Sequence, residues 1–167
     1  MIPFNVLFEE GSNQLEYKGK LINKYFEVDS PGEYDIKIRF VSRKSQYNQA
    51  VVLFFNDFIG SYYLFGEEQM IPKTRFPKKN YWSDTAPREL ELKLLLKKGS
   101  VWICNGSDPL GTKQFCRTLH YGCAMYIEKI GENYYRFNCN DHENDDDFDD
   151  LVFEMEIVQK TSSICVK

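Results

Sequence analysis

The segment from residue 140 to residue 150 concentrates the side chains best suited to chemistry. It reads NDHENDDDFDD and holds seven carboxylates without one Lys or Arg. Carboxylates at this density repel one another, so a folded chain must leave them in water or neutralise them with a cation. Calcium takes roughly six to eight oxygen ligands from Asp, Asn and backbone carbonyls. We therefore predict a calcium site here, with ligands among Asp141, Asp145, Asp147, Asp149 and Asp150.

The charge balance of the whole chain supports a local site. The net charge is −4, and seven of the 25 acidic residues lie in this one segment. Without them, the 21 Lys and Arg residues outnumber the remaining acids. The negative charge is therefore concentrated in one place rather than spread over a solubilising surface.

An EF-hand is the first alternative to consider for this segment. Asp145, Asp147, Asp149 and Glu156 fall at positions 1, 3, 5 and 12 of such a loop. Position 6 needs Gly for its sharp turn, and this chain has Asp150 there. The flanking sequences also alternate as strands do, so we exclude an EF-hand.

Period-two alternation of apolar and polar residues predicts strands along most of the chain. Residues 50–55 (AVVLFF) form a continuous apolar run, typical of a strand covered on both faces, and we expect a hairpin around Ile59-Gly60. A helix competes at residues 89–96 (ELELKLLL), but strict alternation and the following Gly99 favour a strand. The predicted strands are 33–40, 50–55, 61–65, 89–96, 101–104, 123–130, 133–139 and 151–158.

These strands define the fold class. About nine strands in all, including the eight ranges above, with almost no helix predict an all-β, antiparallel β-sandwich or jelly roll. The length of 167 residues suits one domain over residues 1–167.

Several other features narrow the function. No stretch reaches the roughly 20 apolar residues of a membrane span, and the start lacks the features of a signal peptide. A pI near 5.3 without a nucleic-acid motif argues against nucleic acid. We expect ordinary buried thiols for the five cysteines, with a zinc site including His120 and His142 as the alternative. Asn105-Gly106-Ser107 matches the N-glycosylation pattern, but we expect a plain turn there.

The segment KTRFPKKNYWSDT (residues 73–85) is the best candidate for a ligand-binding loop. The rings of Tyr81 and Trp82 suit stacking on a sugar, and hydroxyl groups could bind Asn80, Asp84 and Arg88. The alternative is that Trp82 is a core residue beneath the loop.

The basic residues of the same segment suggest a different ligand. Lys73, Arg75, Lys78 and Lys79 could contact an anionic polymer such as an acidic glycan.

An enzyme is disfavoured. The chain has no GxSxG, no HExxH and no phosphate-cradling glycine loop. Cys116 and His120 could act as nucleophile and base, but no third group is evident to orient them. We therefore expect a binding module.

The order of these motifs resembles the jelly-roll carbohydrate-binding modules of the galactose-binding-domain-like superfamily. The matching pieces are PGEYDIKIRF, AVVLFFNDFIG, the Tyr81-Trp82 loop, ELELKLLLKKGSVWI and DDLVFEMEI. In that group an early pair of glutamates often meets a late aspartate around a structural calcium. The resemblance thus implies that Glu9 or Glu10 joins Asp149 or Asp150.

A second resemblance is to bacterial calcium-dependent galactose lectins. It is carried by GCAMYIEKIGENYYRFNCND, followed by the acidic segment and an alternating last strand. Asn140-Asp141 and Asp149-Asp150 stand where those lectins carry their paired ligands, although the segment here is almost all Asp. The resemblance implies a calcium-binding β-sandwich that binds carbohydrate, with Asn140 contacting the ligand, at the cell surface or outside the cell. The alternative is a protein-interaction or adhesin module with a purely structural calcium.

Overall fold

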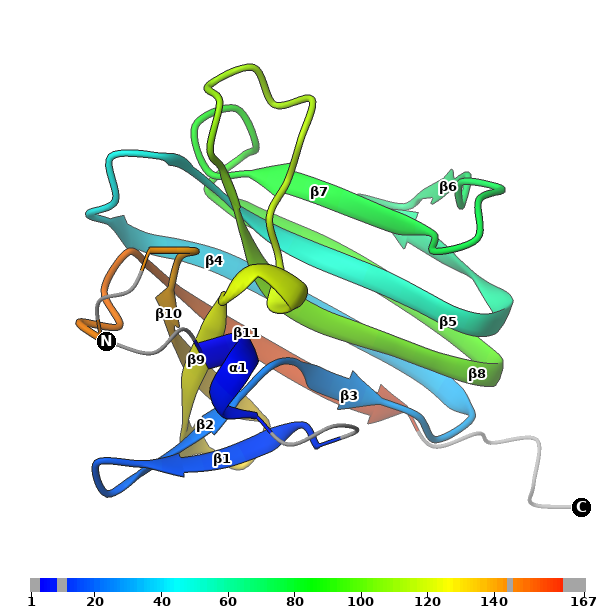
Figure 1. Cartoon of the computed structure of the whole chain (residues 1–167). Coiled ribbons are helices and arrows are strands. Elements are labelled where there is room, and N and C mark those ends of the chain that lie inside the picture. The colour runs from blue at the N-terminus through cyan, green and yellow to red at the C-terminus, as the bar shows by residue number, and fades with distance from the viewer. Residues whose placement is uncertain (1–3, 9–11, 144–145, 161–167) are drawn as a thin grey trace, which may run out of the picture.

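The computed structural model describes residues 4–8, 12–143 and 146–160, and these consist mainly of strands (Figure 1). The helical pieces are one turn of α-helix and one 3-10 turn. In chain order the elements are α1 (Phe4–Leu7), β1 (Gln14–Tyr17), β2 (Lys20–Asn23), β3 (Phe26–Val28), β4 (Gly32–Arg43), β5 (Asn48–Leu64), β6 (Glu67–Gln69), β7 (Lys78–Trp82), β8 (Glu89–Asp108), η1 (Leu119–Tyr121), β9 (Ala124–Gly131), β10 (Tyr134–Asn140) and β11 (Leu151–Lys160). The predicted all-β class is confirmed.

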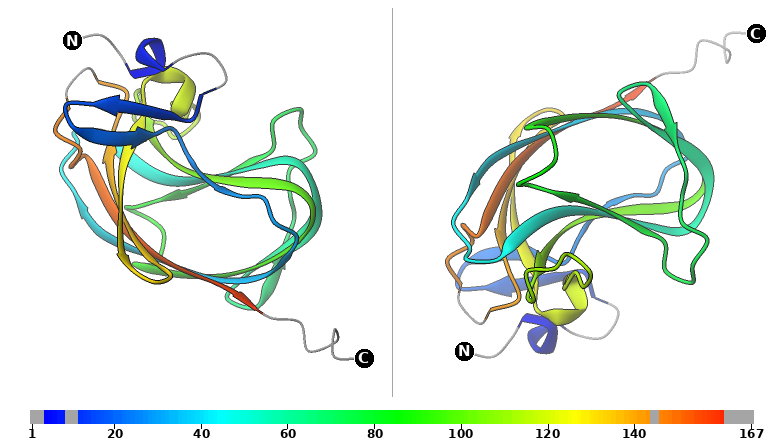
Figure 2. Two further views of the ribbon diagram at one scale, coloured as in Figure 1. Left: turned by 90° about the horizontal axis from the view of Figure 1, so that it is seen from below. Right: turned by 90° about the horizontal axis from the view of Figure 1, so that it is seen from above.

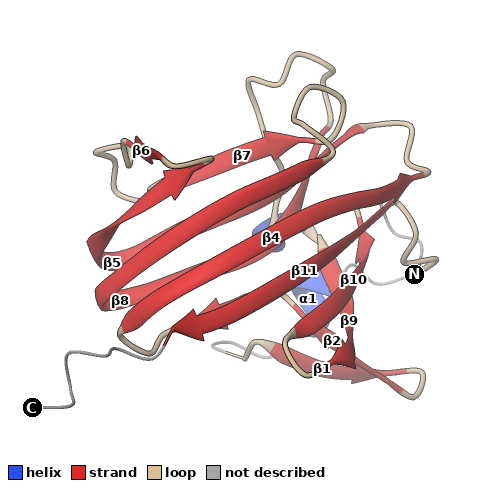
Figure 3. Ribbon diagram, turned by 180° about the vertical axis from the view of Figure 1, so that it is seen from behind, coloured by secondary structure: helices blue, strands red, loops and turns tan. Residues whose placement is uncertain are grey.

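The strands form one antiparallel hydrogen-bonded network. Its main path runs β1-β2-β9-β10-β11-β4-β8-β5-β6, with β3 paired to β8 and β7 paired to β5. Strand β4 lies between β11 and β8, although both follow it by many residues in sequence (Figure 3). Long-range pairing therefore brings the last strand beside the first long one.

Two long strands bend the sheet over on itself. Strand β5 pairs with β8 along its whole length, from Asn48↔Asp108 to Leu64↔Leu92, and the register shifts between Asn56 and Gly60. The sheet curls at this point, so that two layers face each other across an apolar interior (Figure 2).

The bend depends on two glycines. Gly60 has φ +155°, and a Cβ there would lie 1.9 Å from the carbonyl oxygen of Leu95. Gly99 has φ +84°, and a Cβ there would lie 2.3 Å from the carbonyl oxygen of Asp57. The expected hairpin around Ile59-Gly60 is therefore wrong: the glycines allow close approach of two continuous strands instead of ending them.

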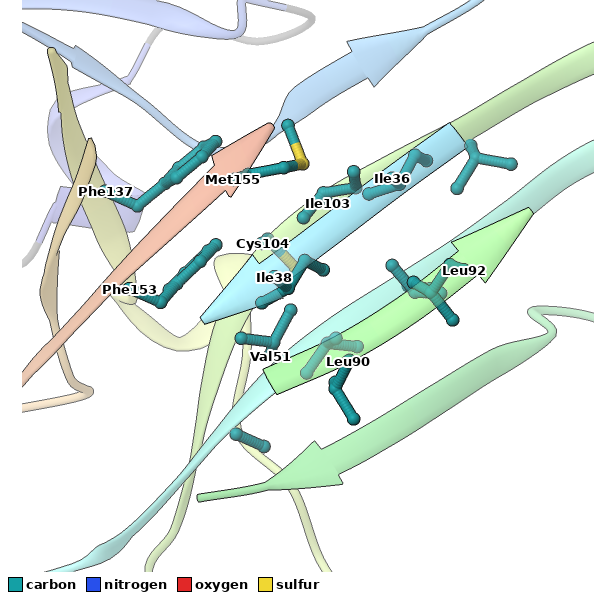
Figure 4. Packing of buried hydrophobic residues seen from close by; sticks show 14 of the residues in the cluster. Ile36, Ile38, Val51, Leu90, Leu92, Ile103, Cys104, Phe137, Phe153 and Met155 are labelled. Carbon is teal, nitrogen blue, oxygen red and sulfur yellow. The ribbon is translucent and has the colours of Figure 1, made fainter. Parts of the chain in front are cut away.

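The core fills the space between the layers, as Figure 4 shows. Every second residue is buried from Tyr34 to Phe40 in β4 and from Leu90 to Leu96 in β8, which confirms a strand at residues 89–96 and excludes the helix. The rings of Phe137 and Phe153 stack with centroids 4.4 Å apart. A second, smaller cluster lies beneath α1 and contains Phe4, Phe8, Ile22, Ala124 and Phe148.

Candidate functional site

The acidic segment forms the connection between β10 and β11 (Figure 1). Residues 141–143 and 146–150 of this connection are described, and we call them the acidic loop. Strands lead into and out of it, which confirms that it is not an EF-hand.

Phe148 anchors the acidic loop. Its side chain is buried in the second cluster, with its ring centroid 5.5 Å from that of Phe4. Its backbone has φ 53°, and its N–H donates to Oδ1 of Asn140 at 3.2 Å. A bulky residue adopts this left-handed conformation only when its surroundings impose it. The apolar residue within the charge cluster thus fixes the course of the loop.

Backbone and hydroxyl groups attach the loop to the connection between β4 and β5. The carbonyl of Asp150 accepts the N–H of Lys44 at 3.1 Å. The carboxylate of Asp141 accepts the hydroxyl of Ser45 at 2.6 Å and the N–H of Glu143 at 2.9 Å. Asp150 Oδ2 accepts the N–H of Asp141 at 2.9 Å. Asp141 and Asp150 are both buried, so these bonds replace water around their carboxylates.

Lysines from other parts of the chain neutralise part of the negative charge of the acidic loop. Lys18 Nζ lies 2.6 Å from Asp146 Oδ2, and Lys44 Nζ lies 3.5 Å from Asp149 Oδ2. The hydrogen bond from Lys18 holds the pKa of Asp146 below its usual range. Lysines that are distant in sequence therefore neutralise part of the charge, in addition to water or a bound cation.

Buried polar residues at the end of β8 hold the same loop from the other side. Asn105 donates to the carbonyl of Asn140 at 2.7 Å, and Ser107 Oγ lies 2.5 Å from Nδ1 of His142. Burial lowers the pKa of His142. Asn105 and Ser107 lie fully buried within β8, so the turn expected at Asn105-Gly106-Ser107 is wrong.

Three carboxylates of the loop come together as a possible metal site. One carboxylate oxygen each from Asp147, Asp149 and Asp150 lie within 4.8 Å of one another. The first is exposed, the second half-buried and the third buried, so the group faces solvent on one side. Oxygen ligands in this arrangement suit a hard cation, with water completing the shell.

The other predicted metal ligands have different positions. Among the residues that the structure describes, the cluster does not include Asp141, whose carboxylate organises the loop through hydrogen bonds. Asp145, Glu9 and Glu10 lie outside the described residues.

Tyr81 and Trp82 lie in strand β7, so their predicted position in a loop is wrong. Both side chains are half-buried and pack against the main core. The hydroxyls of Tyr81 and Tyr62 are 3.4 Å apart, and burial raises the pKa of Tyr81. Lys113 Nζ lies 5.9 Å from the centre of the Trp82 ring. The pattern KKNYW pairs with β5, a long-range contact that the local sequence does not reveal.

The residues predicted to bind hydroxyls are separated. Asp84 pairs with Lys113 at 2.8 Å, which places it close to Trp82. Asn80 lies in β7, and its Oδ1 is buried without a donor in the described part of the chain. Arg88 instead donates to the carbonyl of Phe40 at 3.4 Å.

Sequence reasoning missed the loop between β8 and η1. The buried carboxylate of Asp108 accepts the N–H groups of Leu110, Gly111 and Lys113 at 3.3, 3.0 and 2.9 Å, which shapes the loop. The loop exposes the ring of Phe115, whose centroid is 5.8 Å from that of Tyr121. The Asp-Pro-Leu-Gly sequence was a turn signal.

The cysteines behave as structural thiols. The four described cysteines are buried free thiols without a disulfide bond: Cys104, Cys116, Cys123 and Cys139. Burial raises the pKa of Cys116 to about 11, which opposes its use as a nucleophile. The zinc alternative gains no support, because the only metal-compatible cluster among the described side chains is the Asp group.

Comparison with protein-family models, curated proteins and solved structures gave no match. The resemblance to carbohydrate-binding modules and galactose lectins therefore stays a prediction. None of the helices in the described ranges has the length and apolar character needed to cross a membrane.

Proposed function

We propose that this chain is a calcium-binding β-sandwich module that binds carbohydrate at the end of the sheet bearing the acidic loop. The observation that carries the proposal is the convergence of Asp147, Asp149 and Asp150 within 4.8 Å. A divalent cation there offsets carboxylate repulsion and fixes the loop to the start of β11. We further propose that the crossovers placing β4 between β11 and β8 belong to a jelly roll.

A thermal melt with calcium and with chelator tests the metal. Calcium bound only by the folded state, at about 100 times its Kd, adds about 2.7 kcal/mol and raises the Tm of a chain this size by roughly 5–10 °C. Asp147→Asn should abolish the calcium-dependent rise in Tm, because Asp147 belongs to the cluster of three carboxylates. Asp146→Asn is the matched control, since it removes the same charge from a residue paired with Lys18. Equal melting temperatures of the unaltered protein with and without calcium would refute the metal site.

The carbohydrate surface we propose adjoins the acidic loop. The exposed rings of Phe115 and Tyr121 offer apolar faces for a sugar, and Asp84 and Lys113 offer groups for its hydroxyls. The connections that carry them lie side by side at one end of the sheet (Figure 1).

A glycan array with and without chelator tests the ligand. Tyr121→Ala should weaken sugar binding, whereas Ile130→Ala, which removes another exposed apolar side chain, should not. Absence of any sugar signal under calcium-replete conditions would exclude carbohydrate binding.

The second candidate is a protein-interaction or adhesin module with a purely structural calcium. It is favoured by the position of Trp82, which packs against the core and has Lys113 beside its ring. This candidate predicts a calcium-dependent Tm together with a blank glycan array.

A further inference from the structure

A hollow lies at the opposite end of the sheet from the acidic loop. It has a volume of about 720 Å³ and lies between the bulge of β5 and the loop that precedes β7. Figures 1 and 2 both place this bend away from the acidic loop. The volume lies within the range of roughly 300–1,000 Å³ that is usual for ligand pockets. Six of its lining residues carry the inference: Asn56, Asp57, Phe58, Arg75, Phe76 and Lys98.

The walls of the hollow are held in place by the backbone. The N–H of Phe55 donates to the carbonyl of Pro77 at 3.0 Å, which attaches the loop to β5. The ring of Phe58 packs edge-on against Phe55, with centroids 5.2 Å apart. Gly99 allows β8 to approach the bulge closely. β-Bulges often direct side chains at binding sites, and this one places residues 56–59 on the rim.

The polar groups of the hollow favour a ligand with negative charge. Arg75 and Lys98 both line it, against the single carboxylate of Asp57. Asn56 also lines the hollow, although its amide nitrogen is buried and has no acceptor in the described part of the chain. Two cationic side chains thus outnumber one carboxylate, and an arginine can bind a carboxylate or sulfate through two parallel bonds.

The apolar groups favour a ligand with a ring. Phe76 is 70% exposed, and the Cζ atom of Arg75 lies 5.4 Å from its ring centre. An exposed ring beside a guanidinium suits a sugar ring that carries an acidic group, since the C–H face packs on the aromatic ring while the anion meets the cation.

We propose that this hollow binds an acidic oligosaccharide, whose rings carry carboxylate or sulfate groups. The site is separate from the acidic loop and uses none of its carboxylates. Binding is therefore independent of calcium, and it does not rest on the function proposed for the other end. Of the basic residues in segment 73–85, Arg75 lines the hollow, whereas Lys78 points elsewhere and its Nζ lies 3.5 Å from the carbonyl of Cys116.

The test is titration calorimetry of the full chain with a short oligomer of galacturonate in the presence of EDTA. The matched ligand control is the neutral galactose oligomer of the same length. We expect galacturonate to bind, the neutral oligomer not to bind, and affinity to fall as salt is added. Chelator prevents calcium from cross-linking the uronate chains and keeps the result independent of the acidic loop.

Three variants locate the binding. Arg75→Gln and Lys98→Gln should each weaken it by about tenfold, as expected for one charge-assisted hydrogen bond. Lys129→Gln removes the same charge from an exposed position near the end of β9 and should leave affinity unchanged. Unchanged melting temperatures of these surface variants would show that they fold.

Three outcomes would overturn the proposal. They are the absence of galacturonate binding, an equal loss of affinity in Lys129→Gln, and Arg75-dependent binding of anionic phospholipid vesicles without binding of the oligosaccharide. The last outcome would assign the exposed side chains of Phe76 and Met70 to a lipid surface.

Discussion

Two groups of carboxylates in this molecule have opposite surroundings. Glu154, on β11, is 3% exposed and binds both Arg39 and Arg136, and the hydroxyl of Tyr134 donates to its Oε1 at 3.1 Å. In the acidic loop, by contrast, three carboxylates approach one another within 4.8 Å. Glu154 thus has two cations for one carboxylate, whereas the cluster of three carboxylates has the amine of Lys44, which lies 3.5 Å from Asp149 Oδ2. The surroundings of the charges, more than their number, therefore indicate where an additional cation would stabilise the fold.

The two groups also differ in what holds them. Glu154 sits in regular strands, directly across from Arg136 on β10 and Arg39 on β4. The acidic loop has no such ladder and depends on Phe148 and on bonds from distant segments. Substitutions that remove these contacts should therefore affect Glu154 and the acidic loop in different ways.

The largest effect is expected from removal of the loop's apolar anchor. Phe148→Ala empties a buried site in the second cluster and should reduce the free energy of unfolding by about 3 kcal/mol. It should also weaken the calcium-dependent rise in Tm, because the loop loses its fixed course. Urea unfolding with and without calcium measures both effects. Phe115→Ala, at an exposed ring, is the control and should change stability by less than about 0.5 kcal/mol. A Phe148→Ala protein as stable as the control would show that the cluster does not hold the loop.

The next effect concerns Glu154 and should depend on pH. Burial alone would raise the pKa of Glu154, but the hydrogen bonds from Arg136, Arg39 and Tyr134 outweigh it and hold the pKa below its usual value. Stability from this group is therefore fully present above the unfolded-state pKa near 4.5 and is lost as the pH falls below it. Since both arginines are partly exposed, Glu154→Gln should cost only about 1–2 kcal/mol at neutral pH.

Acid denaturation checks this prediction. The loss of stability below pH 4.5 should be shallower in Glu154→Gln than in the unaltered protein. Glu156→Gln, which removes an exposed carboxylate from the same strand, is the control. Parallel acid curves for Glu154→Gln and the unaltered protein would contradict a role for the arginines.

The sequence predicted the strands because their pattern is local. Alternation in residues 33–40 and 89–96 directly reports a sheet with one face buried. It did not predict that β5 and β8 are each continuous, because Gly60 and Gly99 have the local appearance of turns. Their actual role, a close approach between two strands, depends on the pairing partner.

The same limit applies to the candidate site. The density of carboxylates located the loop. The groups that bind these carboxylates could not be predicted from the local sequence, because Ser45 lies 96 residues from Asp141 and Lys18 lies 128 residues from Asp146. Trp82 was misplaced for a related reason, since β7 exists only through its pairing with β5.

The smallest effect is expected at the exposed edge of the acidic loop, where Lys18 pairs with Asp146. In Lys18→Gln the pKa of Asp146 should rise toward its ordinary value, because the hydrogen bond that lowers it is gone. Global stability should stay the same within error, since water and salt screen a pair this exposed. A carboxyl-detected NMR titration reports the pKa, and urea unfolding reports the stability. Lys20→Gln, two residues further along the same hairpin at the start of β2, should leave the pKa of Asp146 unchanged. If Lys18→Gln also left the pKa of Asp146 unchanged, Lys18 would not neutralise this carboxylate. The contrast with Glu154, which is paired with two arginines, would then extend to Asp146.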